Sequence, residues 1–353
     1  TPKPIKEAGK KAIDDNFSKY SPVPGYPALR NAISKKLKAE NGLDYAASEI
    51  IVGTGGKQGV CNAIMALVNP GDEVIIPAPY WVSYPQMVKL AGGNPVIISA
   101  GIEQDFKITA AQLEASITPK TKMIILCSPS NPTGSVYTKA ELDELAKVVI
   151  SHEDVFVLSD EIYEHINYIG KHASIAACPN MKERTIICNG VSKAYAMSGW
   201  RLGWVAAPEW IVKGLNKLQG QYTSGTSSVS QMAALAAYEG DQQCVEDFRK
   251  TFQRRRDLIV NLAKGIPGLE VNIPQGAFYL FPKCSSFFGK SNGKYTINNS
   301  TDLAMYLLEE GHVATVGGDD FGSPDCFRMS YATSDDNIKE ALQRIKDALS
   351  KLK

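Results

Sequence analysis

Seven short, largely apolar runs between residues 49 and 208 constrain the fold more than any other feature of this 353-residue chain. They cover residues 50–52, 73–76, 96–98, 123–126, 155–158, 185–188 and 202–206. The runs are continuous rather than alternating with polar residues, which is typical of strands buried on both faces. Helical segments or turns separate them. We therefore expect an α/β fold with a seven-stranded, mainly parallel sheet covered by helices.

The pattern changes beyond residue 229. Helical patterns over 233–237 and 248–262 precede a Gly- and Pro-rich turn, and short strands over 269–271, 278–281, 313–316 and 326–330 alternate with helices over 302–310 and 337–349. This order predicts a smaller α+β domain at the C-terminal end. We place a large domain at 14–245 and a small domain at 246–353, joined by an N-terminal segment 1–13 within a helix predicted over 1–17.

Composition narrows the classes of partner. Lys and Arg number 38 against 37 Asp and Glu, so neither nucleic acid nor an anionic membrane is an expected partner. No apolar segment reaches transmembrane length, and no signal peptide is expected at Thr1. The seven cysteines are scattered without metal-type spacing. We expect reduced thiols, no metal site and a cytoplasmic location.

Ligands of open α/β sheets bind at the carboxyl ends of the strands. After the first run comes Gly-Thr-Gly-Gly-Lys-Gln, with Gly55, Gly56 and Lys57 directly before a predicted helix. Backbone N–H groups at such a helix start can bind an anion. The spacing matches neither the Walker A nor the G-x-G-x-x-G pattern. A single phosphate is therefore a better ligand than a nucleotide, although such a turn alone is a weak signal.

The next strand ends present groups for a flat ring. Trp81 follows two prolines, which suits stacking on an aromatic ligand as well as ordinary packing. Asn131 stands between prolines, where its amide is displayed unless it only forms a turn. Asp160 ends a buried strand and needs a partner to stay ionised, and a protonated pyridine nitrogen would serve.

Lys193 follows the sixth run among small and apolar residues. Burial lowers the pKa of an amine, and a neutral amine can form a Schiff base. Arg201, eight residues on, can bind a phosphate with two hydrogen bonds. Arg328 lies inside an apolar strand and needs an anion, such as a substrate carboxylate. Together these groups describe one ligand, pyridoxal phosphate, which needs an Asp at its nitrogen and a Lys at its aldehyde.

Over essentially its whole length the sequence resembles the class I/II pyridoxal-phosphate aminotransferases. Within them it is most similar to the bacterial-type (Ib) aspartate aminotransferases and their aspartate/prephenate relatives. The similarity rests on long motifs at residues 55–58 (GGKQ), 79–85 (PYWVSYP), 130–134 (SNPTG), 159–164 (SDEIYE), 192–201 (SKAYAMSGWR) and 330–334 (SYATS). The resemblance implies the fold of the type I pyridoxal-phosphate transferases.

The resemblance also implies roles at the cofactor ring. Lys193 would form the Schiff base and then move the proton between the substrate α-carbon and the cofactor. Asp160 would pair with the pyridine nitrogen. Asn131 and Tyr163 would hold the phenolic oxygen, and Trp81 would stack on the ring.

The phosphate would be held by the backbone at Gly55, Gly56 and Lys57, by Ser192 and by Arg201. In the family a tyrosine matching Tyr20 reaches the phosphate of the neighbouring subunit. The resemblance therefore implies a homodimer with shared active sites.

For the substrate, the resemblance implies that Arg328 binds the α-carboxylate, assisted by Asn131 and Trp81. Lys57 would bind the distal carboxylate of aspartate or glutamate, or else be the first solvated residue of a helix. In the family, an N-terminal arm and a substrate-contacting loop precede the helix on which this sequence opens.

The expected activity is transamination of L-aspartate and L-glutamate with 2-oxoglutarate or oxaloacetate by ping-pong half reactions, in amino-acid biosynthesis. Use of prephenate as the amino acceptor is an alternative, as is an aromatic aminotransferase or β-lyase on the same fold. A regulator with a transaminase-like sensing domain is a third interpretation. The presence of Lys193, Asp160 and Arg328 favours an enzyme.

Overall fold

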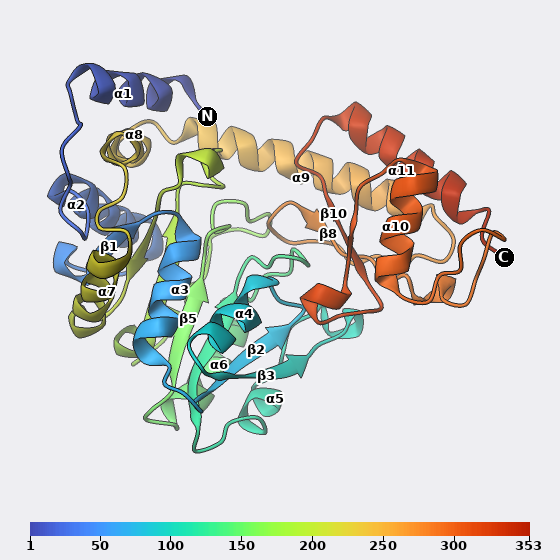
Figure 1. Ribbon diagram of the computed structural model, residues 1–353, viewed down its shortest axis with the longest axis horizontal. Helices are drawn as coiled ribbons and strands as arrows, with labels where there is room; N and C mark the ends of the chain where they lie inside the picture. Colours follow the sequence, from blue (N-terminus) through green and yellow to red (C-terminus); the bar gives the residue numbers. More distant parts are fainter.

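The computed structural model describes residues 1–353 and has a seven-stranded sheet at its centre (Figure 1). Its strands lie in the order β1-β7-β6-β5-β4-β2-β3. Strands β2 to β6 pair in parallel, and β7 alone runs against both of its neighbours, β1 and β6. The bounds are β1 (Ile50–Gly53), β2 (Glu73–Ala78), β3 (Asn94–Ser99), β4 (Thr121–Cys127), β5 (Phe156–Asp160), β6 (Thr185–Gly190) and β7 (Gly203–Ala206). The predicted seven-stranded, mainly parallel sheet is confirmed.

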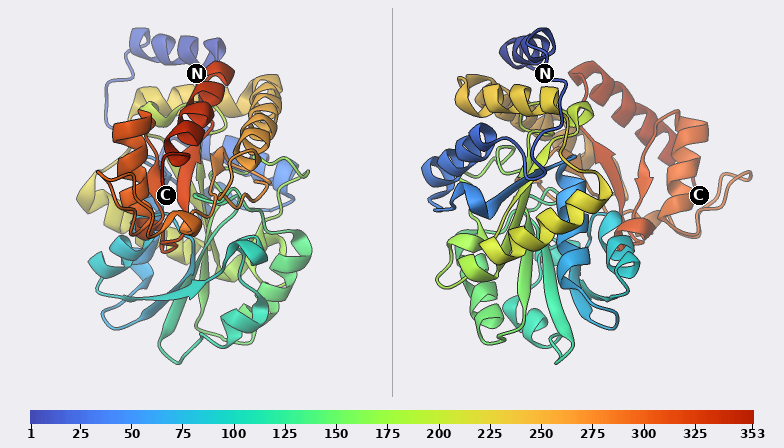
Figure 2. Two further views of the ribbon diagram at one scale, coloured as in Figure 1. Left: turned by 90° about the vertical axis from the view of Figure 1, so that its right-hand side faces the viewer. Right: turned by 60° about the vertical axis from the view of Figure 1, so that its left-hand side comes forward.

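Both faces of this sheet are covered, which explains the continuous apolar runs. On one face, Ile76, Ile125 and Leu158 pack with residues of α3 (Gly56–Leu67), α4 (Ser83–Leu90) and α7 (Glu209–Tyr222). On the other, Ile75 and Ile124 pack with α5 (Ala110–Glu114) and α6 (Lys139–Ile150), and the β1–β7 end packs with α2 (Pro27–Lys36) and α8 (Ser228–Glu239). The two turned views show these layers (Figure 2).

The N-terminal helix α1 (Lys3–Asp14) lies on α8, outside the layer that covers the sheet (Figure 1). Its buried residues are Ile5, Gly9 and Ala12. A Cβ atom at Gly9 would lie 2.8 Å from the Trp200 ring, so the glycine permits this close approach.

A 22-residue helix, α9 (Gln243–Lys264), extends from the sheet region into the C-terminal region (Figure 1). There β8 (Tyr279–Leu280), β9 (Val316–Gly317) and β10 (Phe327–Ser330) form an antiparallel sheet in the order β8-β10-β9. Helices α10 (Ser300–Gly311) and α11 (Asp335–Leu349) contribute to a separate hydrophobic core there. The proposed domain boundary at residue 245 falls in the first turn of α9 and remains a proposal.

One predicted strand is wrong. Residues 269–271 form no strand; Glu270 makes only an isolated bridge to Lys283. The segment lies between Gly268, whose φ is +92°, and Pro274, and it has no neighbour with which to continue a ladder. The strand expected over 278–281 shortens to the two residues of β8, and the strand expected over 313–316 overlaps β9 (Val316–Gly317) only at Val316.

Short helical turns complete the fold. They are η1 (Leu37–Asn41, a π-turn), η2 (Ala47–Glu49), η3 (Ile102–Gln104), η4 (Ile175–Ala177), η5 (Lys182–Arg184), η6 (Ser198–Trp200), η7 (Ser285–Phe287) and η8 (Asp319–Phe321). No helix in the structure has the length and apolar character needed to cross a membrane.

Candidate active site

A cavity of about 300 Å³ lies at the carboxyl ends of the central strands, and β8 and β10 of the C-terminal region also contribute to its wall. It brings together ten of the twelve residues singled out in the sequence. The wall consists of Gly56, Lys57, Trp81, Tyr84, Cys127, Asn131, Asp160, Ile162, Tyr163, Ser192, Lys193, Ser198, Arg201, Tyr279 and Arg328. Gly55 adjoins this wall at the start of α3, whereas Tyr20 is 95% exposed on the surface and does not line the cavity.

Asp160, the last residue of β5, holds a buried carboxylate in this wall. The Tyr84 hydroxyl donates to it at 2.7 Å and the Ile162 backbone N–H at 3.3 Å. Both donors are neutral, and burial raises the pKa of Asp160 to about 6. A cationic ligand group beside this carboxylate would reverse the effect, because an opposite charge favours the ionised form.

Lys193 lies in the loop after β6 and is partly buried. Its Nζ is 5.5 Å from the ring centres of both Tyr163 and Phe278. Burial lowers the pKa of Lys193, and the charges of Arg328 and Arg201 lower it further against the opposing effect of Asp160. This lowered pKa makes the neutral, nucleophilic form of the amine more accessible than in a solvated lysine.

The glycine turn before α3 lies directly beside the Arg201 guanidinium, an arrangement that could hold an anion. Gly55, with φ of +83°, is the N-cap of α3 and supplies no side-chain oxygen to the free N–H groups of the first turn. A Cβ at Gly55 would overlap the Arg201 guanidinium, and one at Gly203 would overlap the Gly56 nitrogen. Arg201 Nη1 donates a hydrogen bond of 2.8 Å to the carbonyl oxygen of Ser198. Only glycine allows the backbone and this guanidinium to approach so closely.

Arg328 enters the cavity from β10. Its Nη1 donates to Asn131 Oδ1 at 2.9 Å, and its guanidinium lies 4.7 Å from the Tyr279 ring centre and 4.9 Å from that of Phe321. Lys57 Nζ lies 5.1 Å from the Trp81 ring centre. Neither Lys57, Arg201 nor Arg328 forms an ion pair within the chain. Lys57 and Arg201 are exposed and Arg328 is partly buried, so three cations of one cavity wall attract a ligand with several negative groups.

The donor set fits pyridoxal phosphate. A buried carboxylate without a cationic partner, a lysine with a lowered pKa and a glycine turn beside an arginine match its nitrogen, aldehyde and phosphate. Cys127 does not add a reactive thiolate, because burial raises its pKa to about 12.

Sequence reasoning assigned no role to several residues of the wall, above all Tyr84 and Tyr279. Tyr84 falls within the quoted 79–85 motif, but only the fold shows that its hydroxyl reaches Asp160. Tyr279 lies in an apolar strand and resembles an ordinary core residue in sequence.

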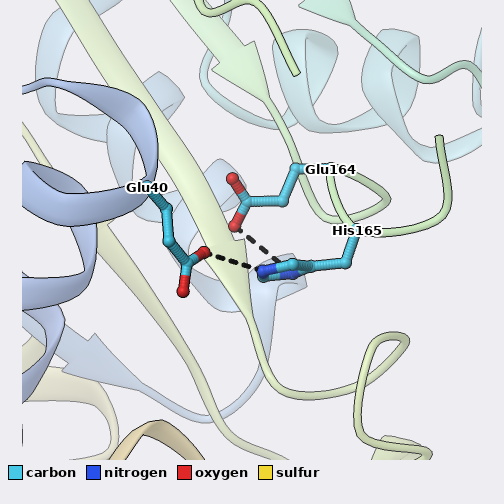
Figure 3. Close-up of side chains that lie close together, drawn as sticks. All are labelled: Glu40, Glu164 and His165. Carbon is cyan, nitrogen blue, oxygen red and sulfur yellow. Dashed lines mark hydrogen bonds and ion pairs between the residues drawn. The ribbon is translucent and has the colours of Figure 1, made fainter. Parts of the chain in front are cut away.

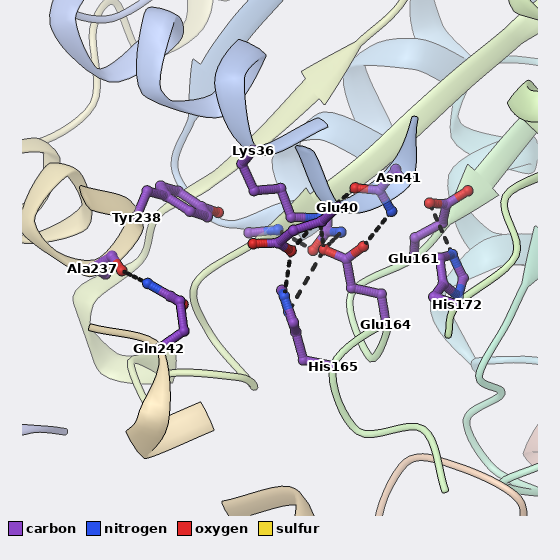
Figure 4. A network of polar contacts seen from close by, with 12 residues as sticks. Lys36, Glu40, Asn41, Glu161, Glu164, His165, His172, Ala237, Tyr238 and Gln242 are labelled. Atoms are coloured by element: carbon purple, nitrogen blue, oxygen red, sulfur yellow. Dashed lines mark hydrogen bonds and ion pairs between the residues drawn. The ribbon is translucent and has the colours of Figure 1, made fainter. Parts of the chain in front are cut away.

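A polar cluster lies outside the cavity and includes residues of the segment that follows β5. Figure 3 shows Glu40, Glu164 and His165, whose ligand atoms lie close enough to hold a metal ion; His165 Nε2 is 2.9 Å from Glu40 Oε2. The Lys36 ammonium, however, is hydrogen-bonded to Glu164 within the same group, so a cation is already present (Figure 4). We assign no metal to this cluster.

The Glu164 carboxylate in this cluster joins three parts of the chain. It accepts hydrogen bonds from Lys36 of α2, from Asn41 of η1 at 2.9 Å and from Asn189 of β6 at 2.9 Å. Glu164 directly follows Tyr163, and Asn189 is four residues before Lys193. The cluster thus fixes two active-site segments from outside the cavity.

The chain is similar to known proteins over its whole length. The family model described as aminotransferase class I and II matches residues 1–345. The bifunctional aspartate aminotransferase and glutamate/aspartate-prephenate aminotransferase of Petunia hybrida is 48% identical, over 100% of this chain and 75% of that protein. The aspartate/prephenate aminotransferase of Cereibacter sphaeroides is 49% identical, over 98% and 87%. The crystal structure of the aspartate aminotransferase from Rhizobium meliloti superposes with a TM-score of 0.97 at 45% identity, over 100% of this chain and 89% of that one.

Proposed function

The chain belongs to the class I and II aminotransferase family, and from this premise we propose that it transfers the amino group of L-aspartate or L-glutamate to 2-oxoglutarate or oxaloacetate. It is an enzyme of the transaminase class. One observation supports the dicarboxylate substrate most: the unpaired cations Lys57 and Arg328 lie in the wall of the same cavity as Lys193.

We propose pyridoxal phosphate as the cofactor. Asp160 would hold its pyridine nitrogen, Trp81 would stack on its ring, and Asn131 and Tyr163 would bind its phenolic oxygen. When bound, the cofactor supplies an electron sink for negative charge at the substrate α-carbon. The phosphate ligands would be the backbone at Gly55, Gly56 and Lys57 together with Ser192 and Arg201.

Lys193 would act as nucleophile and then as the base that moves the α-proton. Burial supports this role, because it lowers the pKa of the amine and so favours the form that accepts a proton. Asp160 would stay ionised beside the pyridine nitrogen, and the hydrogen bond from Tyr84 also favours that charged state.

We further propose that Arg328 binds the α-carboxylate, with Asn131 orienting the guanidinium, and that Lys57 binds the distal carboxylate. Prephenate is a second candidate acceptor, because the named activities of two relatives include it and it also carries a second carboxylate. An aromatic aminotransferase or a β-lyase would have less use for the charge of Lys57.

A homodimer is part of the proposal. The side chain of Tyr20 is 95% exposed, as expected for a residue that reaches a neighbouring subunit. We also propose a reducing compartment such as the cytoplasm, which the seven unpaired cysteines support.

The visible spectrum of the protein loaded with pyridoxal phosphate tests the proposal. We expect a yellow absorption band that bleaches with aspartate and returns with 2-oxoglutarate. A yellow protein that is indifferent to aspartate and glutamate would refute the dicarboxylate substrate, and prephenate with the aminated cofactor would be tried next. A protein that takes up no pyridoxal phosphate would refute the proposed cofactor.

A further inference from the structure

Tyr279, on β8, contacts two active-site residues to which different roles are proposed. Its hydroxyl oxygen lies 2.9 Å from that of Tyr163, and its ring lies against the Arg328 guanidinium at 4.7 Å. Strand pairing fixes this position: Tyr279 is opposite Ser330 in the β8–β10 ladder, two residues from Arg328. Both tyrosines are buried, with 3% exposure at Tyr163 and 7% at Tyr279.

The number of protons in this pair restricts its arrangement. Each hydroxyl has one proton, and burial raises the pKa of Tyr163 well above its ordinary value and that of Tyr279 as well, so both remain neutral. Only one of them can donate in their mutual hydrogen bond. If Tyr163 donates to a ligand oxygen in the cavity, Tyr279 must donate to Tyr163. A hydroxyl that accepts a hydrogen bond becomes a stronger donor itself.

We propose that Tyr279 is a positioning residue. Its hydroxyl strengthens the hydrogen bond from Tyr163 to the phenolic oxygen of the cofactor. Its ring holds in place Arg328, the arginine proposed to bind the substrate α-carboxylate. This inference rests on the proposed function, because it assumes the cofactor in the cavity. It links the two regions of the molecule, since Tyr163 follows β5 of the central sheet and Tyr279 belongs to the C-terminal sheet.

The other titratable groups around this pair are Asp160 at the end of β5, Lys193 after β6, Arg328 on β10 and Cys127 at the end of β4. Asp160, Lys193 and Arg328 carry a charge or gain or lose one during the titration. All three residues are present in the parent protein and in each Tyr279 variant. A difference between variants therefore reports the tyrosine pair.

The test compares Y279F and Y279L with the parent protein, each loaded with pyridoxal phosphate. The readouts are the pH midpoint of the visible absorption change and the KM for aspartate. Y279F keeps the ring beside Arg328 and loses the hydroxyl. When the bound cofactor loses its proton, its phenolic oxygen next to Tyr163 carries more negative charge. A weaker hydrogen bond from Tyr163 to that oxygen therefore disfavours the deprotonated cofactor. We expect the midpoint to rise by about half to one pH unit, with little change in KM.

Y279L removes the ring as well. It should show the same midpoint shift together with a KM for aspartate raised several-fold, because Arg328 loses its aromatic neighbour. The matched control is Y331F. The Tyr331 hydroxyl lies 3.2 Å from that of Tyr168 in the same core but does not line the cavity, so its loss should leave the midpoint unchanged.

A double-variant cycle with Y163F completes the test. Once the Tyr163 hydroxyl is gone, removing that of Tyr279 should produce no further shift. The proposal is overturned if Y279F and Y279L keep the parent midpoint, if Y331F shifts it equally, or if the two shifts add. Failure of the proposed function is distinct, since the parent protein itself would then not turn yellow or respond to aspartate.

Discussion

The hydroxyl of Tyr84 donates a hydrogen bond of 2.7 Å to the carboxylate of Asp160. The two residues are 76 positions apart, on α4 and at the end of β5, and both are buried. Tyr84 is thus one of only two groups that donate to this carboxylate within the chain. Burial disfavours the charged form of Asp160, whereas the hydrogen bond from Tyr84 and the charge of Lys193 favour it.

Asp160 should destabilise the protein at neutral pH when no cofactor is bound. Its pKa in the folded chain is raised to about 6, so its contribution to stability is greatest below the ordinary carboxyl pKa and is lost as the pH rises through 6. D160N should therefore stabilise the cofactor-free protein at pH 7–8 by about 2–3 kcal/mol, from a shift of about two pKa units. Urea unfolding at pH 4 and pH 8 measures this. Equal stability differences at the two pH values would contradict it.

K193A should abolish transamination while the protein still binds pyridoxal phosphate without a covalent bond. The loss should exceed about 10³-fold, because one side chain provides both nucleophile and base. Turnover of aspartate and removal of the cofactor by dialysis are the measurements. K290A is the control, since Lys290 lies outside the cavity on the Phe287 ring and should leave both unchanged. Retained turnover in K193A would remove Lys193 from the mechanism.

R328L should raise the KM for aspartate strongly. Removing the guanidinium from a buried pair with a carboxylate costs about 2–5 kcal/mol, so kcat/KM should fall by about 30-fold or more. Steady-state kinetics with aspartate and with glutamate provide the check, and both should be affected because both present an α-carboxylate. Unchanged kinetics would exclude Arg328 as the carboxylate ligand.

K57A should discriminate between substrates. If Lys57 binds the distal carboxylate, its removal should lower kcat/KM for aspartate by about 10- to 100-fold and leave that for phenylalanine nearly unchanged. The ratio of the two values is the quantity to measure. An equal loss for both amino acids would assign Lys57 a structural role at the start of α3.

K36M should destabilise the folded chain. The substitution removes the Lys36 ammonium that pairs with the Glu164 carboxylate. The side chains of Lys36 and Glu164 are only 3% and 4% exposed. Removing one partner of a buried ion pair costs about 3–5 kcal/mol, and the amides of Asn41 and Asn189 that still donate to Glu164 carry no charge to replace the ammonium. Denaturant unfolding at pH 7 measures the loss. The control K38M removes only the exposed pair with Asp44, which should change stability by less than about 1 kcal/mol. Similar losses in both variants would show that burial of the pair is irrelevant.

Much of the fold could be predicted because a strand that is buried on both faces is apolar at nearly every position, and this pattern is visible in the sequence. Runs such as 123–126 and 185–188 are apolar at successive positions, so their strands, and the cavity at their carboxyl ends, followed from sequence. The segment 269–271 (Leu-Glu-Val) is short and has a charge at its centre, and it makes only an isolated bridge at Glu270. Composition gives no information about pairing partners.

The hydrogen bonds and ion pairs that position the active-site residues have no comparable pattern in the sequence. Tyr279 and Tyr84 are aromatic residues among apolar neighbours, and their hydroxyl partners are 116 and 76 positions away. The Lys36–Glu164 pair joins residues 128 positions apart. Such contacts depend on how the helices and strands are assembled, and a single sequence shows only what lies near each residue along the chain.

The reversed direction of β7 has a consequence for how this enzyme could diversify. Gly190 and Gly203 face each other at the base of the loop that holds Lys193 and Arg201, and a Cβ at Gly190 would lie 2.7 Å from the Gly203 Cα. The loop therefore leaves and re-enters the sheet at one point, as a self-contained module. Arg328 and Tyr279 belong to another sheet. Substitutions there can change how tightly an amino acid is bound without altering the backbone that places Lys193.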